Sequence, residues 1–430
     1  MRILIIYSWP TLWSMGTGKG SPDFYLSLKA LAGAFSRVVL VHPGGPDCLL
    51  AGQLPEGIES LSFRWPGGGK VIGRPAWLRD NTKYWGRLSR ILLFALNWSL
   101  RLFSYLAFTL NAWRAAGKAA SGGDFDLVAA YGYMGVPAGR LISRKLGLPL
   151  VVRLFGVSLG MKGFSFPARL AQFEETLSFR IAAGRWVITN DGSGGDQVAR
   201  RLGVPEDKVL YLLNGVDKSR GPRHIEFDRE QYRQRLGLAS ETRVVLRVAR
   251  LWPQQRIDRL IEALAACPAA GLPVAAVVIG EGSEREYLET LALELGVRVI
   301  FTGAVANRDL AEHYLCADLY LATSDRTNLS NSALEALNHG LPVIALDTGG
   351  TGSVIREGVN GRLVAFEQRQ RLGAILKQTL SDSALLARLA GGALRTAEEF
   401  IPSYEQRMEQ EVAAMSFRPV DITHLSREKD

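Results

Sequence analysis

The sequence predicts an α/β protein built from two doubly wound domains, and three observations support this fold class. Short apolar runs alternate with segments of helical periodicity along most of the 430 residues. The runs are continuously apolar, as expected for parallel strands that helices cover on both faces. They fall into two blocks separated by a polar stretch at 218–226 with Gly221 and Pro222, so each block predicts its own sheet.

The predicted strands follow one another in a regular order within each block. The first block contributes residues 3–7, 38–41, 127–130, 150–153 and 186–189. The second block contributes residues 244–248, 275–279, 297–301, 319–322 and 343–346. The N-terminal apolar run is too short for a signal peptide and Pro10 follows it, so we expect it to form a buried first strand.

Residues 62–123 interrupt the first block and hold the net charge of the chain. They contain ten Lys/Arg, one acidic residue and five of the nine tryptophans. This segment therefore has a net charge of +9, and the remaining chain is neutral. Because the charge is local and no nucleic-acid motif accompanies it, the sequence argues against a nucleic-acid partner.

A long helix is predicted within this segment, at about 81–118. Its apolar runs, 91–100 and 102–113, are shorter than the ~20 residues that a membrane span needs. Several polar residues fall within about one 100° arc of the helix, beside apolar and aromatic residues such as Trp98. Two interpretations remain open: core helices of the first domain, or a basic and aromatic face lying in the plane of an anionic membrane. The basic residues of this arc are Lys83, Arg87, Arg90 and Arg101.

The cysteines, histidines and acidic residues show no metal-binding pattern. Cys48, Cys267 and Cys316 are odd in number and form no CxxC pair, which excludes a disulfide framework or a Cys-based zinc site and fits a reducing compartment. The five histidines are scattered, which argues against histidine catalysis. We therefore expect no bound metal.

A glycine-rich loop follows the first predicted strand and precedes a helical segment at 25–35. It contains Gly16, Gly18, Lys19 and Gly20. Backbone N–H groups of such a loop can approach a phosphate at the helix N-terminus. The loop matches neither the dinucleotide-binding nor the P-loop pattern, so a flexible turn is the alternative.

The second block contains short motifs in a characteristic order. They are Asn-Gly-Val-Asp at 214–217, Arg-Leu at 250–251, Gly-Glu-Gly at 280–282, Thr-Gly at 302–303, Ala-Asp at 317–318, Asn-Ser-Ala-Leu-Glu-Ala-Leu at 331–337, Gly-Leu-Pro-Val at 340–343, Gly-Gly-Thr at 349–351 and Gly-Val-Asn-Gly-Arg-Leu-Val at 358–364. In this order and spacing, the sequence resembles the retaining glycosyltransferases of the family-four type (glycosyl transferases group 1), which have the GT-B fold. The resemblance covers both blocks and is strongest over 186–364.

The resemblance implies two Rossmann-like domains that face each other across a cleft. Residues 1–222 would form the acceptor-binding domain, with 62–123 as a basic and aromatic helical insertion. Residues 223–400 would form the domain that binds the nucleotide sugar. A C-terminal helix at 401–416 would cross back to the first domain, and the polar residues 417–430 predict a loose tail.

The resemblance also assigns roles to individual residues. Arg250 matches the arginine that binds the diphosphate, and its guanidinium suits a leaving group whose negative charge grows in the transition state. Glu335 matches the glutamate that accepts hydrogen bonds from the ribose hydroxyls. The alternatives are a surface arginine and a helix N-terminal charge, respectively. Further donor contacts are expected from Gly18, Lys19, Gly20, Gly280, Gly282, Leu329, Ser330 and Asn331.

One departure from the family pattern concerns the donor sugar. The family has two glutamates eight positions apart, and the position of the first is Thr327 in this chain. That glutamate normally contacts the donor-sugar hydroxyls. Asp325 or Asn328 is a candidate for its role, so Asn328 joins Arg250 and Glu335 as a candidate catalytic residue.

Two further departures concern charged side chains. The position of the family's lysine after the arginine is Gln255, and the neighbouring Arg256 is a candidate replacement for its charge. The position of the usual histidine of the first domain reads Phe155-Gly156. The acceptor-side candidates are Gly16, Arg153, Phe155 and Gly156.

Together these patterns predict a retaining glycosyltransferase. It would move a sugar from a nucleotide-diphosphate donor, expected to be a UDP-sugar, to a lipid-linked or surface-glycan acceptor. The resemblance implies that the donor's own phosphate takes the acceptor proton, so we expect no protein base, metal or separate cofactor. The basic insertion favours the cytoplasmic face of an anionic membrane. Two alternatives remain: a sugar-nucleotide epimerase, and a non-catalytic scaffold subunit of a glycan-assembly complex.

Overall fold

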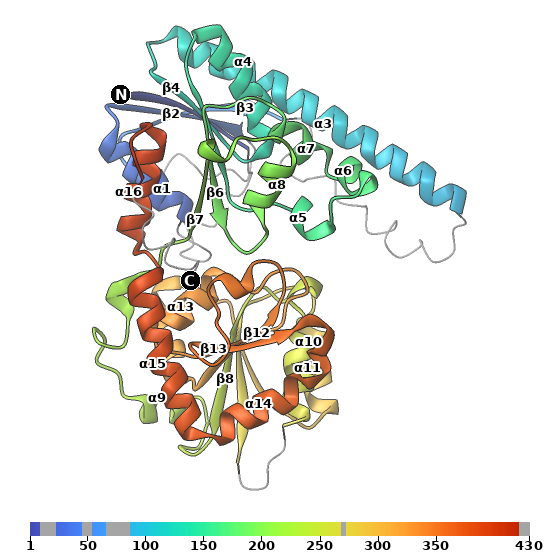
Figure 1. Ribbon diagram of the computed structural model, residues 1–430, viewed down its shortest axis with the longest axis vertical. Coiled ribbons are helices and arrows are strands. Elements are labelled where there is room, and N and C mark those ends of the chain that lie inside the picture. Colours follow the sequence, from blue (N-terminus) through green and yellow to red (C-terminus); the bar gives the residue numbers. More distant parts are fainter. Residues whose placement is uncertain (9–22, 45–53, 66–86, 268–271, 421–430) are drawn as a thin grey trace.

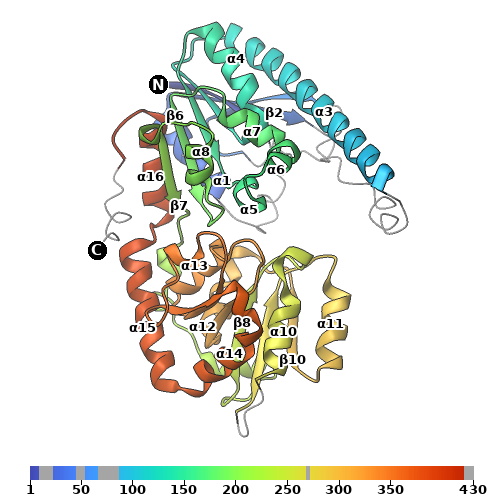
Figure 2. The same ribbon diagram turned by 45° about the vertical axis from the view of Figure 1, so that its right-hand side comes forward.

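The structure is a computed structural model that describes residues 1–8, 23–44, 54–65, 87–267 and 272–420. Two α/β domains are stacked along the long axis of the molecule (Figure 1). Each domain has one parallel sheet flanked by helices, as the second view in Figure 2 also shows. The predicted fold class of two doubly wound α/β domains is confirmed.

The first sheet has seven parallel strands in the order β3-β2-β1-β4-β5-β6-β7. The chain builds one side outward from β1 and the other side outward from β4, so its direction switches between these two strands. β4 and β5 are buried at every residue, as expected for central strands between two helical layers. The strands are β1 (Arg2–Tyr7), β2 (Arg37–Gly44), β3 (Ile58–Arg64), β4 (Leu127–Tyr131), β5 (Leu150–Leu154), β6 (Arg185–Asn190) and β7 (Val209–Leu213).

Helices cover both faces of this sheet. They are α1 (Asp23–Ala34), α3 (Arg87–Ser121), α4 (Val136–Leu146), α5 (Leu159–Lys162), α6 (Phe166–Ala171), α7 (Phe173–Phe179) and α8 (Gly195–Arg201), with the 3-10 turns η2 (Tyr133–Gly135) and η3 (Glu206–Lys208). The helix predicted at about 81–118 is found as α3, and residues 81–86 lie outside the described residues. The C-terminal half of α3 packs on β2, β3 and α4 and buries Phe108, Ala112 and Ala116, so this half is a core helix. The other half extends past the sheet (Figure 1).

The second sheet has six parallel strands in the order β10-β9-β8-β11-β12-β13. Its strands are β8 (Arg243–Val248), β9 (Val274–Ile279), β10 (Arg298–Gly303), β11 (Leu319–Ala322), β12 (Val343–Asp347) and β13 (Gly361–Ala365). Its helices are α9 (Arg229–Arg235), α10 (Ile257–Ala265), α11 (Arg285–Glu294), α12 (Ala311–Cys316), α13 (Asn331–Asn338), α14 (Leu372–Ser381) and α15 (Ser383–Phe400). The 3-10 turns are η4 (Lys218–Arg220), η5 (Pro253–Gln255), η6 (Asn307–Asp309), η7 (Thr351–Ser353) and η8 (Phe366–Arg371). Here the chain changes direction between β8 and β11.

All ten predicted strands are present in the structure. Three further strands, β3, β7 and β13, are not predicted by the apolar runs, and all three lie at sheet edges. An edge strand is partly exposed and needs no continuous apolar run. β3, for example, has a single buried residue among its seven.

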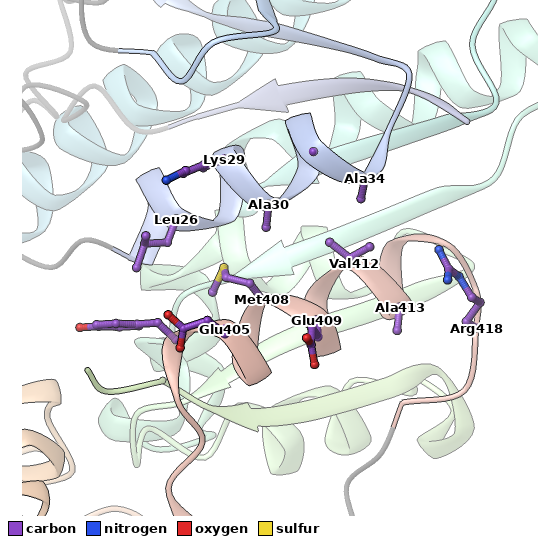
Figure 3. Close-up of a pocket in the computed structure, with 12 residues that line it drawn as sticks. Leu26, Lys29, Ala30, Ala34, Glu405, Met408, Glu409, Val412, Ala413 and Arg418 are labelled. Carbon is purple, nitrogen blue, oxygen red and sulfur yellow. The ribbon is translucent and has the colours of Figure 1, made fainter. Parts of the chain in front are cut away.

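A last helix, α16 (Tyr404–Met415), packs on the first domain. It begins after Ser403, whose side chain forms a capping box with Gln406. The helix contacts α1, and its Ala414 and Met415 join the core cluster that includes β1, β2 and β4. An apolar groove of about 590 Å³ remains between α1 and α16, with Met408 and Val412 on the α16 side (Figure 3). α16 therefore completes one helical layer of the N-terminal sheet.

A buried ion cluster lies beneath this helix contact. Glu411 of α16 accepts a hydrogen bond from Arg153 Nε at 3.0 Å and pairs with Arg407 Nη1 at 3.0 Å. The hydroxyls of Ser27 and Tyr131 donate to the same carboxylate at 2.5 and 3.0 Å. Burial would raise the pKa of Glu411, but the two guanidinium groups and the hydroxyl donors lower it to about 2. The cluster connects α16 with α1, β4 and β5.

Candidate active site

The C-terminal sheet opens at the carboxyl ends of β8 and β11. β8 pairs with β9 along its whole length, but with β11 only at Val245 and Leu246. Beyond these residues the two strands separate, and their connections leave the sheet on opposite sides. In doubly wound sheets, ligands bind in the crevice at such a switch point. The loops that follow β8, β9 and β11 contain most of the predicted donor-site residues.

The loops after β8 and β9 run side by side. Leu251 N donates to Glu281 O at 2.9 Å, and a Cβ at Gly280 or Gly282 would lie 1.9 or 2.2 Å from a backbone oxygen of the β8 loop. The two glycines thus permit this close backbone approach. Arg250 is exposed beside them and lies over the Trp252 ring at 4.0 Å. It has no ion-pair partner among the described residues, and desolvation lowers its pKa. Its charge is therefore available to an anionic ligand.

The helix that follows β11 places its positive end at this crevice. Ser330 caps α13 by accepting a hydrogen bond from Ala333 N at 3.3 Å. Asn331 Oδ1 accepts a hydrogen bond from Asn214 Nδ2, which lies just after β7, at 2.6 Å. Leu329 is buried in the core and offers its backbone only. Backbone N–H groups at a helix N-terminus suit phosphate binding.

Glu335 lies in the second turn of α13. Its carboxylate accepts a hydrogen bond from the Tyr314 hydroxyl at 2.8 Å. It lines a small pocket of about 20 Å³, with Asn307 and His339 also in the wall. A volume of this size holds about one water molecule. Glu335 is therefore held by the neighbouring helix α12 and lines a small recess.

Asn328 is placed differently from the expectation of a catalytic contact. It is buried, and its Oδ1 accepts a hydrogen bond from Ser324 N at 2.8 Å. Its Nδ2 donates to Leu346 O at 3.0 Å and to Thr348 Oγ1 at 2.9 Å. Because these bonds occupy both ends of the amide, Asn328 shapes the 324–331 loop and does not present its side chain to a substrate. This corrects its predicted role.

Thr327 contacts the other domain. Its hydroxyl donates to Asp191 O at 2.7 Å, and Gly350 N donates to Gly192 O at 2.6 Å. The 324–331 loop and the loop after β12 thus bond directly to the loop after β6. At the position where the family has a glutamate for the donor sugar, this chain has a residue that joins the two domains.

Gln255 and Arg256 are also engaged within the protein. Gln255 Oε1 accepts a hydrogen bond from Arg247 Nη2 at 2.8 Å. Arg256 pairs with Asp258 at 2.8 Å and with Asp325 at 3.2 Å, and these bonds raise its pKa. Two carboxylates therefore already balance the Arg256 charge, so Arg256 does not supply the free cation that the sequence suggested. Asp325 is likewise occupied.

The first-domain candidates divide into those that the structure describes and those outside the described residues. Arg153 is 1% exposed and bonded to Glu411, so it belongs to the buried ion cluster and not to an acceptor surface, which corrects the prediction. Phe155 packs against Phe24 and under the Arg153 guanidinium. Gly156 has φ +143°, and a Cβ there would lie 2.3 Å from Asp191 Oδ2. The candidates outside the described residues are Gly16, Gly18, Lys19 and Gly20.

A pocket of about 530 Å³ lies between the domains, next to the Thr327 contact. The first domain contributes Arg201 and Tyr211 to its wall, and the second contributes Arg326 and Phe366. The sequence motifs do not predict these residues, because they come from α8, β7, the 324–331 loop and η8, which only the fold brings together. The pocket is lined by aromatic and polar side chains and shares the 324–331 loop with the switch-point crevice.

The predicted membrane residues lie on or before α3. Arg101 pairs with Glu174 of α7 at 2.5 Å, and Trp98 Nε1 donates to Leu170 O at 3.0 Å. Arg87 and Arg90 begin the helix, and Lys83 lies outside the described residues. Within the described residues, no helix is long and apolar enough to span a membrane, and no group of three potential ligands could hold a metal ion.

Comparisons with known proteins identify the class. The model of the family "Glycosyl transferases group 1" matches residues 228–395. D-inositol 3-phosphate glycosyltransferase 1 of Catenulispora acidiphila is 30% identical over 307 residues, covering 66% of this chain and 71% of that protein. The chain therefore belongs to the group 1 glycosyltransferases, as its sequence motifs indicated.

Two solved structures show the same fold over nearly the whole chain. Anabaena HepE in complex with UDP has a TM-score of 0.67 at 22% identity, covering 97% of this chain and all of that one. WaaG, a glycosyltransferase involved in lipopolysaccharide biosynthesis, has a TM-score of 0.66 at 19% identity with the same coverage. The predicted GT-B arrangement is confirmed.

Proposed function

We propose that this protein is a retaining glycosyltransferase that uses a nucleotide-diphosphate sugar, with a UDP-sugar as donor. The observation that supports this most directly is Arg250, an exposed cation without a carboxylate partner among the described residues. It lies two residues after Val248, whose carbonyl accepts a hydrogen bond from Ser332 Oγ in the first turn of α13. The likeness in fold to HepE, which was solved with UDP and with UDP-glucose, supports the choice of base.

In this proposal the residues at the switch point stabilise the leaving group. When the bond between the sugar and the diphosphate breaks, negative charge grows on the phosphate oxygens. The Arg250 guanidinium can donate two parallel hydrogen bonds to them, and the backbone N–H groups at the start of α13 add further donors. Glu335, held by the Tyr314 hydroxyl, would accept hydrogen bonds from the ribose. The donor phosphate takes the proton of the attacking hydroxyl on the same face of the sugar, which retains the configuration.

The acceptor would enter from the first domain. We assign it to the pocket of about 530 Å³ between the domains, where Tyr211 and Phe366 contribute aromatic side chains and Arg201 and Arg326 contribute guanidinium groups. Such a lining suits a glycan, which presents both apolar ring faces and hydroxyls. The acceptor in this proposal is a lipid-linked or surface glycan.

The same proposal places the enzyme on the cytoplasmic face of an anionic membrane. The basic residue Arg101 turns inward to Glu174, and the outward side of α3 is apolar instead. Phe103 is 65% exposed, and Phe166 of the neighbouring helix α6 is 70% exposed. An exposed apolar stripe in a segment of net charge +9 suits the surface of an anionic bilayer. The stripe consists of Leu96, Leu100, Phe103, Leu106 and Leu110.

The experiment combines binding with transfer. Purified protein is titrated with UDP, GDP and ADP, then incubated with the matching nucleotide sugars and a lipid extract, with the anomeric configuration of the product read by NMR. Arg250→Gln should lower nucleoside-diphosphate affinity roughly 10- to 100-fold, because a charged hydrogen bond contributes about 1.5–3 kcal/mol. The matched control is Arg223→Gln, an exposed arginine of the same domain that pairs with Glu398. Wild-type protein that binds no nucleoside diphosphate would refute the proposal.

The placement of Thr327 and Asn328 favours one alternative, a non-catalytic scaffold of the same fold. Both side chains are committed to structural bonds and leave the donor sugar without these contacts. The same experiment separates the two functions. A protein that binds UDP but neither hydrolyses nor transfers any donor sugar is the scaffold.

A further inference from the structure

Arg247 differs from the other buried arginines of the protein. Four arginines are buried among the described residues. Arg153 and Arg407 pair with Glu411, and Arg233 pairs with Asp318 at 2.7 Å. Arg247, in strand β8, is 2% exposed and has no ion-pair partner among the described residues. Its positive charge is therefore buried without a counter-charge.

The partners of Arg247 are neutral. Its Nη2 donates to Gln255 Oε1 at 2.8 Å and its Nη1 to the Tyr320 hydroxyl at 3.2 Å. Its Nε is buried and has no hydrogen-bond partner. Burying a charge without an opposite charge is costly, so we expect an apolar side chain of similar volume to be tolerated at this position. For a purely structural role an apolar residue would suit this position better, like the buried residues at 244–246 of the same strand.

Arg247 lies at the switch-point crevice. It occupies β8 one residue beyond the last pairing with β11, and Tyr320 is the β11 residue of that last pair. The Tyr320 hydroxyl lies 2.8 Å from Ser332 Oγ, in the first turn of α13. Both hydroxyls also lie within hydrogen-bonding distance of Val248 O, at 3.2 and 3.0 Å. A guanidinium that donates to the tyrosine oxygen strengthens that hydroxyl as a donor in turn. The buried cation and the positive end of α13 thus act on the same place.

We propose that Arg247 is a positioning residue for the diphosphate of the donor. Its buried charge attracts the diphosphate, and the Tyr320 and Ser332 hydroxyls carry this effect to the crevice. Gln255 orients the guanidinium. This inference rests on the proposed function, because it requires a nucleoside diphosphate at the crevice. Arg250 contacts the diphosphate directly, whereas Arg247 acts on it from within the sheet through the two hydroxyls. The ligand supplies the negative charge that the described residues lack around Arg247.

The test compares stability with affinity, because a structural role and a positioning role predict opposite results. In Arg247→Met the charge is removed at similar volume. We expect an unchanged or higher melting temperature without ligand, together with a roughly tenfold loss of affinity for the nucleoside diphosphate that wild-type protein binds best. Arg247→Lys retains the charge and should restore most of the affinity. In the contrasting variant Arg233→Met, which removes the ion pair with Asp318 at 2.7 Å and the hydrogen bond to Cys316 O, the melting temperature should fall.

The outcomes are distinct. Affinity that is unchanged in Arg247→Met, in a wild-type protein that binds the diphosphate, overturns this inference alone. A lower melting temperature of Arg247→Met with wild-type affinity shows that the residue is structural, which also overturns it. If wild-type protein binds none of UDP, GDP and ADP, the proposed function fails and the inference fails with it. Uridine serves as the phosphate-free probe, and its binding should not respond to the variants.

Discussion

Replacing Glu411 with glutamine should destabilise the first domain strongly at neutral pH. The carboxylate lies between Arg153 and Arg407, and both ion pairs measure 3.0 Å. The variant keeps the shape of the side chain but leaves two guanidinium groups buried without a counter-charge. Breaking a buried pair in this way costs about 3–5 kcal/mol.

The pH dependence gives a second measure of the same interaction. The pKa of Glu411 falls from an ordinary 4.5 to about 2, which corresponds to about 3 kcal/mol of stability. Because the folded pKa is lowered, this stability is present above about pH 4.5 and is lost as the pH falls toward 2. The difference between wild type and Glu411→Gln should therefore shrink in acid.

Urea unfolding followed by tryptophan fluorescence can measure this, since eight of the nine tryptophans precede residue 222. Wild type and Glu411→Gln are compared at pH 7, 5, 4 and 3. Glu409→Gln, an exposed glutamate on the same helix, is the matched control and should behave as wild type. Equal stability of Glu411→Gln and wild type at pH 7, or a difference that stays constant down to pH 3, would refute the reasoning.

Two further predictions concern the contact between the domains and the surface of α3. Gly192→Ala would place a Cβ 2.2 Å from Thr327 Oγ1 and should lower the transfer rate at least tenfold, because it separates the loops of the two domains. The control Gly203→Ala has a similar positive φ but lies in open space, so it should add only the backbone strain of about 1 kcal/mol. Equal rates for the two variants would show that the interdomain contact is unimportant. Leu106→Glu should reduce binding to anionic vesicles in a flotation assay without changing nucleotide affinity. The control Leu293→Glu changes an exposed leucine of α11 and should leave vesicle binding unchanged. Vesicle binding that is equal in both variants, or absent in wild type, speaks against a membrane role for α3.

The apolar runs of the sequence predict the strands well because central parallel strands are buried on both faces. β4 and β5 are of this kind. The edge strand β3, with a single buried residue, gives no such signal. Central position thus makes a strand visible in the pattern, whereas an edge strand is visible only where it happens to be apolar, as β10 is at 297–301.

The position of a candidate residue could be predicted where it directly follows a strand. Its role could not be predicted where its bonding partner is distant in the sequence. Arg250 lies where the motif order places it. Arg153 looks like an acceptor residue by position, yet its partner Glu411 lies 258 residues further along the chain. Arg247 could have been noticed as a lone charge in the run of β8, but its lack of a counter-charge is visible only in the fold.

The return of α16 to the N-terminal domain has a consequence for synthesis of the protein on the ribosome. The carboxylate that neutralises Arg153 of β5 arrives only with residue 411, after the whole C-terminal sheet has been translated. Until then, the emerging N-terminal domain has a guanidinium without its counter-charge, and the apolar face of α1 that α16 will cover is still exposed. The first domain to be made should therefore be the last to reach its final stability, and nascent chains truncated before residue 404 should remain sensitive to proteases.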